Sequence, residues 1–257
     1  MKIIVQNLAT EYRDEGEGPV MLLLHGWKDS LYTFDDLMPS LLARWRVVRL
    51  DLPGFGESEA PGGAWNLDDY IHFVNEFIQK LNLQVDVLAG HSFGGRIAIK
   101  GQAVKLFKAN KLVLIAPAGI ARKQKLRKSI LKVMAKIGGF LADIPPLILW
   151  RQEIRKKMYN LIGSDYLNAG PLRGTFLKII AEDLSVKARD ITVPTLIIWG
   201  ANDTQTPLAD GQKLSRLVSG SEFKVINGAG HFVHREKHQE VAKLIEDFYD
   251  KKMAVSL

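Results

Sequence analysis

The chain has 257 residues, of which 47% are hydrophobic and 25% charged, with 35 Lys and Arg against 28 Asp and Glu and no cysteine. This balance is that of a folded globular protein, and the length suits one domain with an insertion as well as it suits two domains. The lack of cysteine excludes disulfide bonds, a thiol nucleophile and thiolate metal sites, so any covalent catalysis must use oxygen.

The amino-terminal residues predict no signal peptide, because the apolar run at residues 3–5 is soon followed by charged residues. Apolar runs elsewhere in the chain are far shorter than a membrane span. We therefore expect a cytoplasmic location. Residues 2–5 and 10–13 have the patterns of two edge strands, and the glycine and proline residues at 16–19 predict the turn that follows.

Strand and helix patterns then alternate. Residues 20–24 are an unbroken apolar run that ends at His25-Gly26-Trp27, as expected of a central parallel strand covered on both faces. Residues 34–42 have helical spacing, and residues 47–50 predict a second buried strand that leads into the glycine-broken loop 51–58. Apolar positions from 67 to 81 predict a long amphipathic helix with Asn66 as its cap.

The stretch Gly90-His91-Ser92-Phe93-Gly94 lies where a short buried strand, residues 85–89, passes into helical spacing. So sharp a turn forces the backbone of the serine into an unfavourable region of φ and ψ angles. The two glycines avoid Cβ clashes with the neighbouring strand and helix. Ser92 is thereby presented as a candidate nucleophile. Because Gly-x-Ser-x-Gly arises by chance in about one chain in ten of this length, other residues must complete the chemistry.

A further buried strand at residues 112–116 closes at Pro117, after which residues 119–190 show only helical periodicities. Strand patterns return at residues 195–199 and 223–226, before a terminal amphipathic helix. The alternation predicts an α/β fold with a mostly parallel sheet and helices on both faces. Its core would comprise residues 1–118 and 191–257, and residues 119–190 would form an all-helical lid, or cap, inserted after the sixth strand.

A serine nucleophile needs a base, an acid that holds the base, and donors for the oxyanion. In parallel sheets such groups gather beyond the carboxyl ends of the strands. Asp203 follows the strand at 195–199 and is the candidate acid, while His231, on a glycine-rich loop after the strand at 223–226, is the candidate general base. Asp210 and Asp183 remain open as alternative acids. The order Ser92, Asp203, His231 is the order given for α/β-hydrolases.

The sequence resembles the α/β-hydrolase superfamily, in its lid-bearing branch of esterases, lipases and carbon–carbon bond hydrolases. The resemblance spans essentially the whole chain and rests on five segments in family order: residues 25–27, 51–58, 90–95, 200–203 and 230–232. It implies an oxyanion hole formed by the backbone N–H groups of Trp27 and Phe93. The residues expected to support these loops are His25, Gly26, Gly90 and Gly94. Relatives that open epoxides or cleave carbon–halogen bonds carry aspartate in place of Ser92, which disfavours those reactions.

No cofactor is expected, since the chain has neither a phosphate loop nor a correctly placed dinucleotide fingerprint. His234 and His238 have the spacing of one helical face, with His231 nearby, but no carboxylate has the spacing of a zinc helix motif, so we expect no metal site. Nucleic acid binding is not expected, because the basic residues lack a recognised module. The expected partner is a small-molecule ester, bound by a monomer or a homodimer.

The basic excess of the chain lies in the predicted lid, where residues 119–190 hold 15 Lys and Arg against 6 Asp and Glu. Cationic residues between Arg122 and Lys136 are interleaved with apolar ones, as in an amphipathic helix with a cationic face. A solvated surface is the simpler interpretation. The alternative is peripheral contact with an anionic membrane, with residues 145–150 supplying apolar contact.

Together these features predict a serine hydrolase that cleaves a carboxylic ester of a small or medium acyl group through an acyl-enzyme on Ser92. Hydrolysis of a carbon–carbon bond in a diketone-like substrate and lipase action at an anionic membrane surface remain as enzymatic alternatives. Outside enzymes, the same fold can serve as a ligand receptor.

Overall fold

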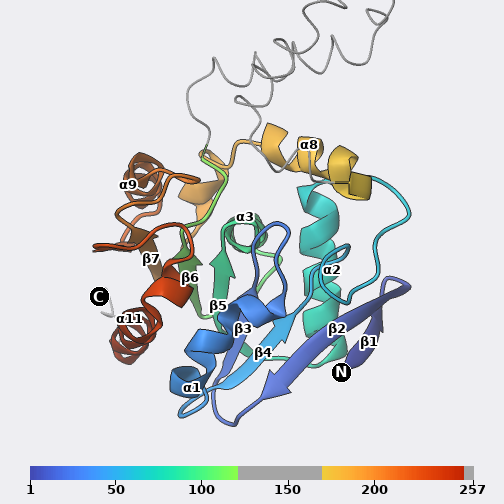
Figure 1. Ribbon diagram of the computed structural model, residues 1–257, viewed down its shortest axis with the longest axis horizontal. Coiled ribbons are helices and arrows are strands. Elements are labelled where there is room, and N and C mark those ends of the chain that lie inside the picture. The colour runs from blue at the N-terminus through green and yellow to red at the C-terminus, as the bar shows by residue number, and fades with distance from the viewer. Residues whose placement is uncertain (121–169, 252–257) are drawn as a thin grey trace, which may run out of the picture.

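The computed structural model describes residues 1–120 and 170–251 and contains one eight-stranded sheet (Figure 1). The strands are β1 (Lys2–Val5), β2 (Leu8–Glu15), β3 (Val20–Leu24), β4 (Arg46–Leu50), β5 (Val85–His91), β6 (Lys111–Ile115), β7 (Thr195–Gly200) and β8 (Glu222–Ile226). Their order across the sheet is β1-β2-β4-β3-β5-β6-β7-β8. β1, β2 and β4 pair antiparallel, and every pair from β4 to β8 is parallel. The predicted mostly parallel α/β sheet is confirmed.

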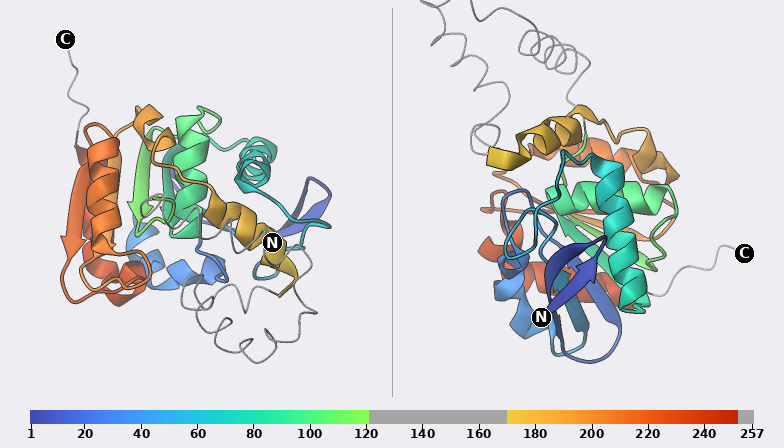
Figure 2. Two further views of the ribbon diagram at one scale, coloured as in Figure 1. Left: turned by 90° about the horizontal axis from the view of Figure 1, so that it is seen from above. Right: turned by 90° about the vertical axis from the view of Figure 1, so that its right-hand side faces the viewer.

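Helices cover both faces of this sheet (Figures 1 and 2). The longer ones are α2 (Leu67–Lys80), α3 (Phe93–Ala103), α8 (Arg173–Ala181), α9 (Leu208–Leu217) and α11 (His238–Asp250). Side chains of β3 alternate between the two layers: Leu22 and Leu24 join the core under α2 and α3, whereas Met21 and Leu23 join the core under α11. A strand buried on both faces cannot carry polar residues on either, which explains its unbroken apolar run.

The long helix predicted after residue 66 is α2. The side chain of Asn66 accepts hydrogen bonds from the backbone N–H groups of Asp68 and Asp69, and the Asp69 carboxylate accepts one from the N–H of Asn66. This reciprocal capping box satisfies N–H groups that have no partner within the helix. The predicted cap and amphipathic helix are both confirmed.

The single helix predicted over residues 34–42 is wrong in detail. The segment is a 3₁₀-helix, η1 (Leu31–Leu37), followed by one short α-helix, α1 (Met38–Leu41). Pro39 lies in the first turn of α1 and has no N–H to donate to an earlier carbonyl. An α-helix is therefore favoured only from Met38 onward, and the preceding turns tighten to i→i+3 geometry.

The shared helical face predicted for His234 and His238 is also wrong. His234 lies in α10 (Val233–Glu236), and His238 is the first residue of α11. Between them Lys237 has φ −137° and ψ 44°, which are not helical angles. The two imidazoles therefore do not follow one helical repeat.

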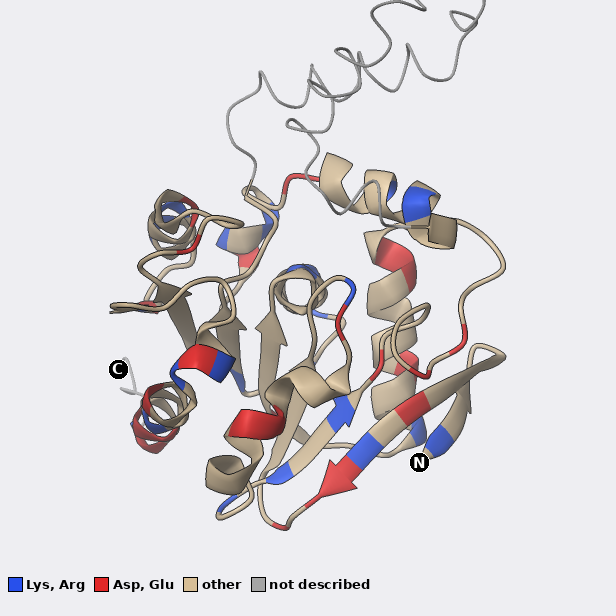
Figure 3. Cartoon of the chain, viewed as in Figure 1, with Lys and Arg blue, Asp and Glu red and all other residues tan. Residues whose placement is uncertain are grey.

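Between β6 and β7, the described residues form η2 (Gly170–Leu172), α8 and η3 (Lys187–Asp190), with no strand among them. The rest of the predicted lid, residues 121–169, lies outside the described residues, and so do the basic pattern at 122–136 and the apolar residues 145–150. Along the described part of the chain, positions of Lys and Arg are interspersed with positions of Asp and Glu (Figure 3). No described helix is long and apolar enough to span a bilayer.

Candidate active site

Ser92 lies at the junction of β5 and α3 with φ 50° and ψ −106°. Positive φ is uncommon for residues other than glycine, so the backbone is strained here as the sequence predicted. The Ser92 N–H donates to the carbonyl oxygen of Ile115 in β6 at 3.1 Å. A Cβ atom on Gly94 would lie 2.1 Å from the Leu24 carbonyl oxygen, and one on Gly90 would lie 2.5 Å from the Gly94 oxygen. The turn therefore requires glycine at both positions.

The loops that carry Asp203 and His231 are bound to each other where β7 and β8 end. The N–H of Asn202 donates to the Ala229 carbonyl oxygen at 2.9 Å. A Cβ atom on Gly200 would lie 2.1 Å from the carbonyl oxygen of Gly230, so glycine is what allows the two loops to approach so closely. Parallel strands that end side by side thus bring together residues far apart in the sequence.

The two predicted side chains meet between these loops. Nδ1–H of His231 donates to Oδ2 of Asp203 at 2.8 Å, and both side chains are buried. With Nδ1 protonated, the Nε2 atom of His231 keeps its lone pair and can accept a proton. Of the three carboxylates that the sequence left open as the acid, it is Asp203 that the structure joins to His231.

Thr206 is a member of this group that the sequence did not reveal. Its hydroxyl donates to Oδ2 of Asp203 at 2.7 Å and lies 3.2 Å from Nδ1 of His231. Backbone N–H groups of Gln205 and Thr206 donate to the other oxygen, Oδ1. Burial favours a higher pKa for Asp203, but the His231 and Thr206 hydrogen bonds outweigh it and lower that pKa, so Asp203 is an anion at neutral pH. Threonine three residues after an acid is the local signal that points to such a bond.

His25 connects the loop after β3 to the loop after β4. Its Nε2 accepts a hydrogen bond from the N–H of Leu52 at 2.9 Å, so the ring proton is on Nδ1, which donates to the Gly26 carbonyl oxygen at 2.7 Å. Burial lowers the pKa of His25, which keeps this ring neutral. The predicted supporting residue therefore orders the turn that precedes Trp27.

Trp27 and Phe93, the candidate oxyanion residues, lie side by side. Their rings are 5.4 Å apart between centroids. The turn before Trp27 also reaches the nucleophile turn, since a Cβ atom on Gly26 would lie 3.4 Å from Cβ of Ser92. The two loops predicted to supply oxyanion donors are thus adjacent to each other and to Ser92.

Two further buried histidines pack behind His231. Nε2–H of His91 donates to the backbone carbonyl oxygen of His231 at 3.0 Å. The ring of His91 lies 4.3 Å from that of His234, whose Nε2 is 3.0 Å from the Thr33 hydroxyl. His91 is the residue before Ser92, so this contact connects the serine turn directly to the histidine loop.

These buried imidazoles predict that the fold is sensitive to acid. Burial lowers the pKa of His91 well below its ordinary value and that of His234 to about 3, with neighbouring histidines acting in the same direction. The native state therefore excludes protons that the unfolded chain binds below about pH 6.5. Each such histidine lowers the free energy of unfolding by about 1.4 kcal/mol per pH unit as the pH falls through that range.

Urea unfolding measured from about pH 7 down to about pH 4.5 should show this loss of stability. His234→Gln is expected to reduce the slope of unfolding free energy against pH by about 1.4 kcal/mol per unit. His72→Gln, at an exposed position on α2, is the matched control. An unchanged slope in His234→Gln would contradict the assignment of His234 as a neutral buried imidazole.

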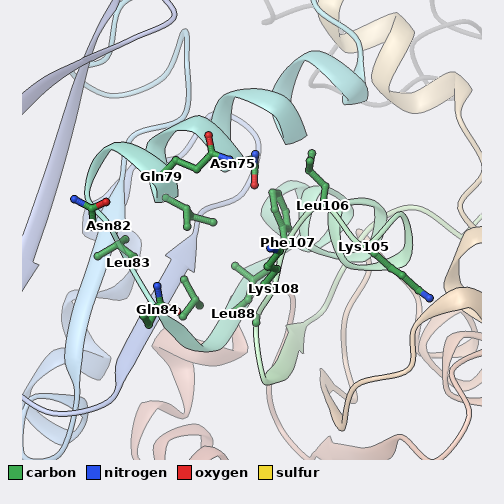
Figure 4. A pocket seen from close by; sticks show the side chains of 13 residues that line it. Asn75, Gln79, Asn82, Leu83, Gln84, Leu88, Lys105, Leu106, Phe107 and Lys108 are labelled. Atoms are coloured by element: carbon green, nitrogen blue, oxygen red, sulfur yellow. The ribbon is translucent and has the colours of Figure 1, made fainter.

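The structure also contains a cavity of about 500 Å³ between the ends of α2 and α3, at the start of β5 (Figure 4). Amide side chains, among them Asn75, Gln79 and Asn82, line it together with apolar residues such as Leu83 and Leu88. Ser92 follows the opposite end of β5, and none of the candidate catalytic residues lines this cavity. Within residues 1–120 and 170–251, no group of three or more His, Asp or Glu residues is arranged to hold a metal ion.

A family model described as the alpha/beta hydrolase family matches residues 21–244. The chain belongs to the alpha/beta hydrolase family. The AB hydrolase superfamily protein YisY of Bacillus subtilis is 31% identical, over 91% of this chain and 93% of its own length. The 2-hydroxy-6-oxo-2,4-heptadienoate hydrolase of Pseudomonas putida is 22% identical, over 96% of this chain and 94% of its own length.

Solved structures show the same alpha/beta hydrolase fold. The enol-lactonase from Burkholderia xenovorans LB400 superimposes with a TM-score of 0.75 at 22% sequence identity, covering 98% of this chain and 100% of that chain. The family model and the Bacillus subtilis relative confirm the resemblance to this family that the sequence indicated. The hydrolases that this chain resembles are named for different substrates, a 2-hydroxy-6-oxo-2,4-heptadienoate in one and an enol-lactone in another.

Proposed function

We propose that this alpha/beta hydrolase cleaves a carboxylic ester of a small or medium acyl group, with Ser92 as nucleophile, His231 as base and Asp203 as acid. The observation that carries the proposal is the 2.8 Å hydrogen bond between Nδ1 of His231 and the Asp203 carboxylate. It fixes the tautomer that a general base needs and stabilises the imidazolium that forms when the base takes a proton. The strained turn at Ser92 supports the same assignment.

In the proposed reaction, Oγ of Ser92 attacks the ester carbonyl carbon while Nε2 of His231 takes the hydroxyl proton. The negative charge that develops on the carbonyl oxygen is stabilised by the backbone N–H groups of Trp27 and Phe93. The carbon–oxygen bond then breaks, and the leaving alcohol takes the proton from His231. His231 then takes a proton from water, whose oxygen attacks the acyl carbon. The bond between that carbon and Oγ of Ser92 breaks, Oγ takes the proton from His231, and the carboxylic acid leaves.

Carbon–carbon bond hydrolysis is the second candidate. It is favoured by the similarity to the Pseudomonas putida enzyme, whose name identifies its substrate as a 2-hydroxy-6-oxo dienoate. The same serine, histidine and aspartate can serve either reaction, so the side chains around the scissile bond decide between them.

A substrate panel separates these candidates. We expect p-nitrophenyl acetate and butyrate to be hydrolysed with a burst of nitrophenol, and mass spectrometry of the quenched enzyme to place the acyl group on Ser92. A vinylogous diketone should react far more slowly. A higher kcat/KM for the diketone would favour carbon–carbon hydrolysis, and turnover of neither class would favour the ligand receptor.

A further inference from the structure

Two buried cations on α3 hold the segment through which the chain returns to the sheet. Arg96, in the first turn after Ser92, donates hydrogen bonds from its guanidinium to the carbonyl oxygens of Ile179 and Glu182 at the C-terminal end of α8. Lys100, one turn later, lies 2.7 Å from the Glu182 carboxylate and 2.8 Å from that of Asp68. The Arg96 and Lys100 residues are each only 6% exposed.

The Arg96 guanidinium is an effective cap for α8. Burial lowers the pKa of Arg96 to about 10, although Glu182 and Asp183 oppose the shift, so the group is still a cation at neutral pH. The last carbonyl groups of a helix have no partner within the helix and carry partial negative charge. A neutral side chain of similar size at this position would leave those carbonyl oxygens with weaker partners.

The same region is connected to the backbone of the candidate nucleophile. The N–H of Ala118 donates to the Ser92 carbonyl oxygen at 3.0 Å. The next residue, Gly119, accepts a hydrogen bond from the N–H of Leu184 at 2.9 Å. The outgoing chain after β6 and the returning chain after α8 are thus bonded to each other and to Ser92.

The body of α8 lies on the side of the sheet where β5 and β6 end (Figure 1). From this helix Phe176 packs against Trp27, with ring centroids 5.2 Å apart. Trp27 in turn contacts Phe55 at 4.9 Å and Phe93 at 5.4 Å. Four aromatic rings therefore form a continuous apolar group, here named the aromatic wall, which includes both candidate oxyanion residues.

We propose that Arg96 is a positioning residue for substrate selectivity, because it holds α8 so that Phe176 completes the aromatic wall. The turn before Trp27 lies against Ser92, since a Cβ atom on Gly26 would be 3.4 Å from Cβ of Ser92, so the partly exposed Trp27 edge of the wall is the part that an ester bound at Ser92 would contact. In this proposal an aromatic or bulky apolar group of the ester gains from that contact, whereas an acetyl group is too small to gain much. The inference rests on the proposed ester hydrolysis and adds the substrate class and the residue that maintains it. Arg96 acts through Phe176 and touches no reacting atom.

The test compares kcat/KM for p-nitrophenyl phenylacetate and p-nitrophenyl acetate in four proteins: wild type, Phe176→Ala, Arg96→Gln and the double variant. Phe176→Ala should lower the phenylacetate-to-acetate ratio about tenfold, mainly through KM. Arg96→Gln should lower the ratio by a similar factor while kcat on acetate changes little. Because both substitutions act on one contact, the double variant should lower the phenylacetate-to-acetate ratio no further than either single variant does.

Arg189→Gln is the matched control, since it removes one positive charge from an exposed residue of η3 in the same returning segment. Arg96→Lys keeps the cation but not the fork of donors, and should give an intermediate ratio even if Arg96→Gln does not fold. Circular dichroism reports on folding. The proposal would be overturned if Phe176→Ala left the phenylacetate-to-acetate ratio unchanged, or if the double variant lowered the ratio by the product of the two single effects. It would also be overturned if Arg96→Gln lowered kcat/KM equally on both esters. Absence of any ester turnover by the wild type would instead overturn the proposed function.

Discussion

Ser92→Ala is expected to lower ester turnover about a million-fold, to the limit of detection, because it removes the atom that would form the acyl-enzyme. A fluorophosphonate probe should label the wild-type protein and should fail to label the variant. Initial rates on p-nitrophenyl acetate and in-gel labelling measure the two effects.

The control for this change is Ser219→Ala, at an exposed serine between α9 and β8, which should keep wild-type rates and labelling. The folded state of Ser92→Ala should be intact, since alanine retains the Cβ atom that the turn already accommodates. Labelling that persists in Ser92→Ala, or an adduct mapped to another serine, would remove Ser92 from its proposed role.

Asp203→Asn is expected to lower kcat about ten-thousand-fold with a small change in KM. An amide at this position has no negative charge to stabilise the imidazolium of His231, and its NH₂ group can favour the wrong tautomer. Steady-state kinetics on the same ester measure the loss. Thr206, which also bonds to Asp203, would not compensate for it, because a hydroxyl carries no charge.

The matched control is Asp210→Asn, in the first turn of α9, which removes a carboxylate close to Asp203 in sequence. Its kcat should stay within about threefold of wild type, as expected for a carboxylate outside the catalytic group. A loss in Asp210→Asn or Asp183→Asn comparable to that in Asp203→Asn would move the role of the acid to that residue.

Much of the fold could be predicted from local patterns, because those patterns reflect burial. The apolar run at Val20–Leu24 is stable only as a strand that is buried on both faces of the sheet. The amphipathic helix after Asn66 is stable only with one face against the core and the other in solvent. Helical spacing of apolar residues does not predict the helix boundary at Pro39, because the spacing says nothing about a missing N–H. The break at Lys237 has no signal in the local sequence pattern, because its backbone angles depend on how α10 and α11 each pack.

The candidate site was predictable to the level of motifs and strand ends. Three carboxylates were available to His231, and only the closure of the loops after β7 and β8 distinguishes them, through contacts such as that of Gly200 with Gly230. The spacing of Thr206 from Asp203 is a local signal for their hydrogen bond, but the contact of the same hydroxyl with His231, 25 positions away, has no local signal. The cap that Arg96 provides joins residues more than 80 positions apart, and no local pattern encodes it.

The hydrogen bond between Gly119 and Leu184 indicates where a change of sequence would leave the sheet undisturbed. It joins the chain that leaves β6 to the chain that returns after α8, and α8 itself is bonded to Arg96 and contacts Trp27. Because the entropy of closing a loop grows only slowly with its length, the residues between Gly119 and α8 can be exchanged for a longer or shorter segment at small entropic cost. We expect a graft that keeps α8 to change the substrate range while the contacts of Arg96 and Phe176 are retained.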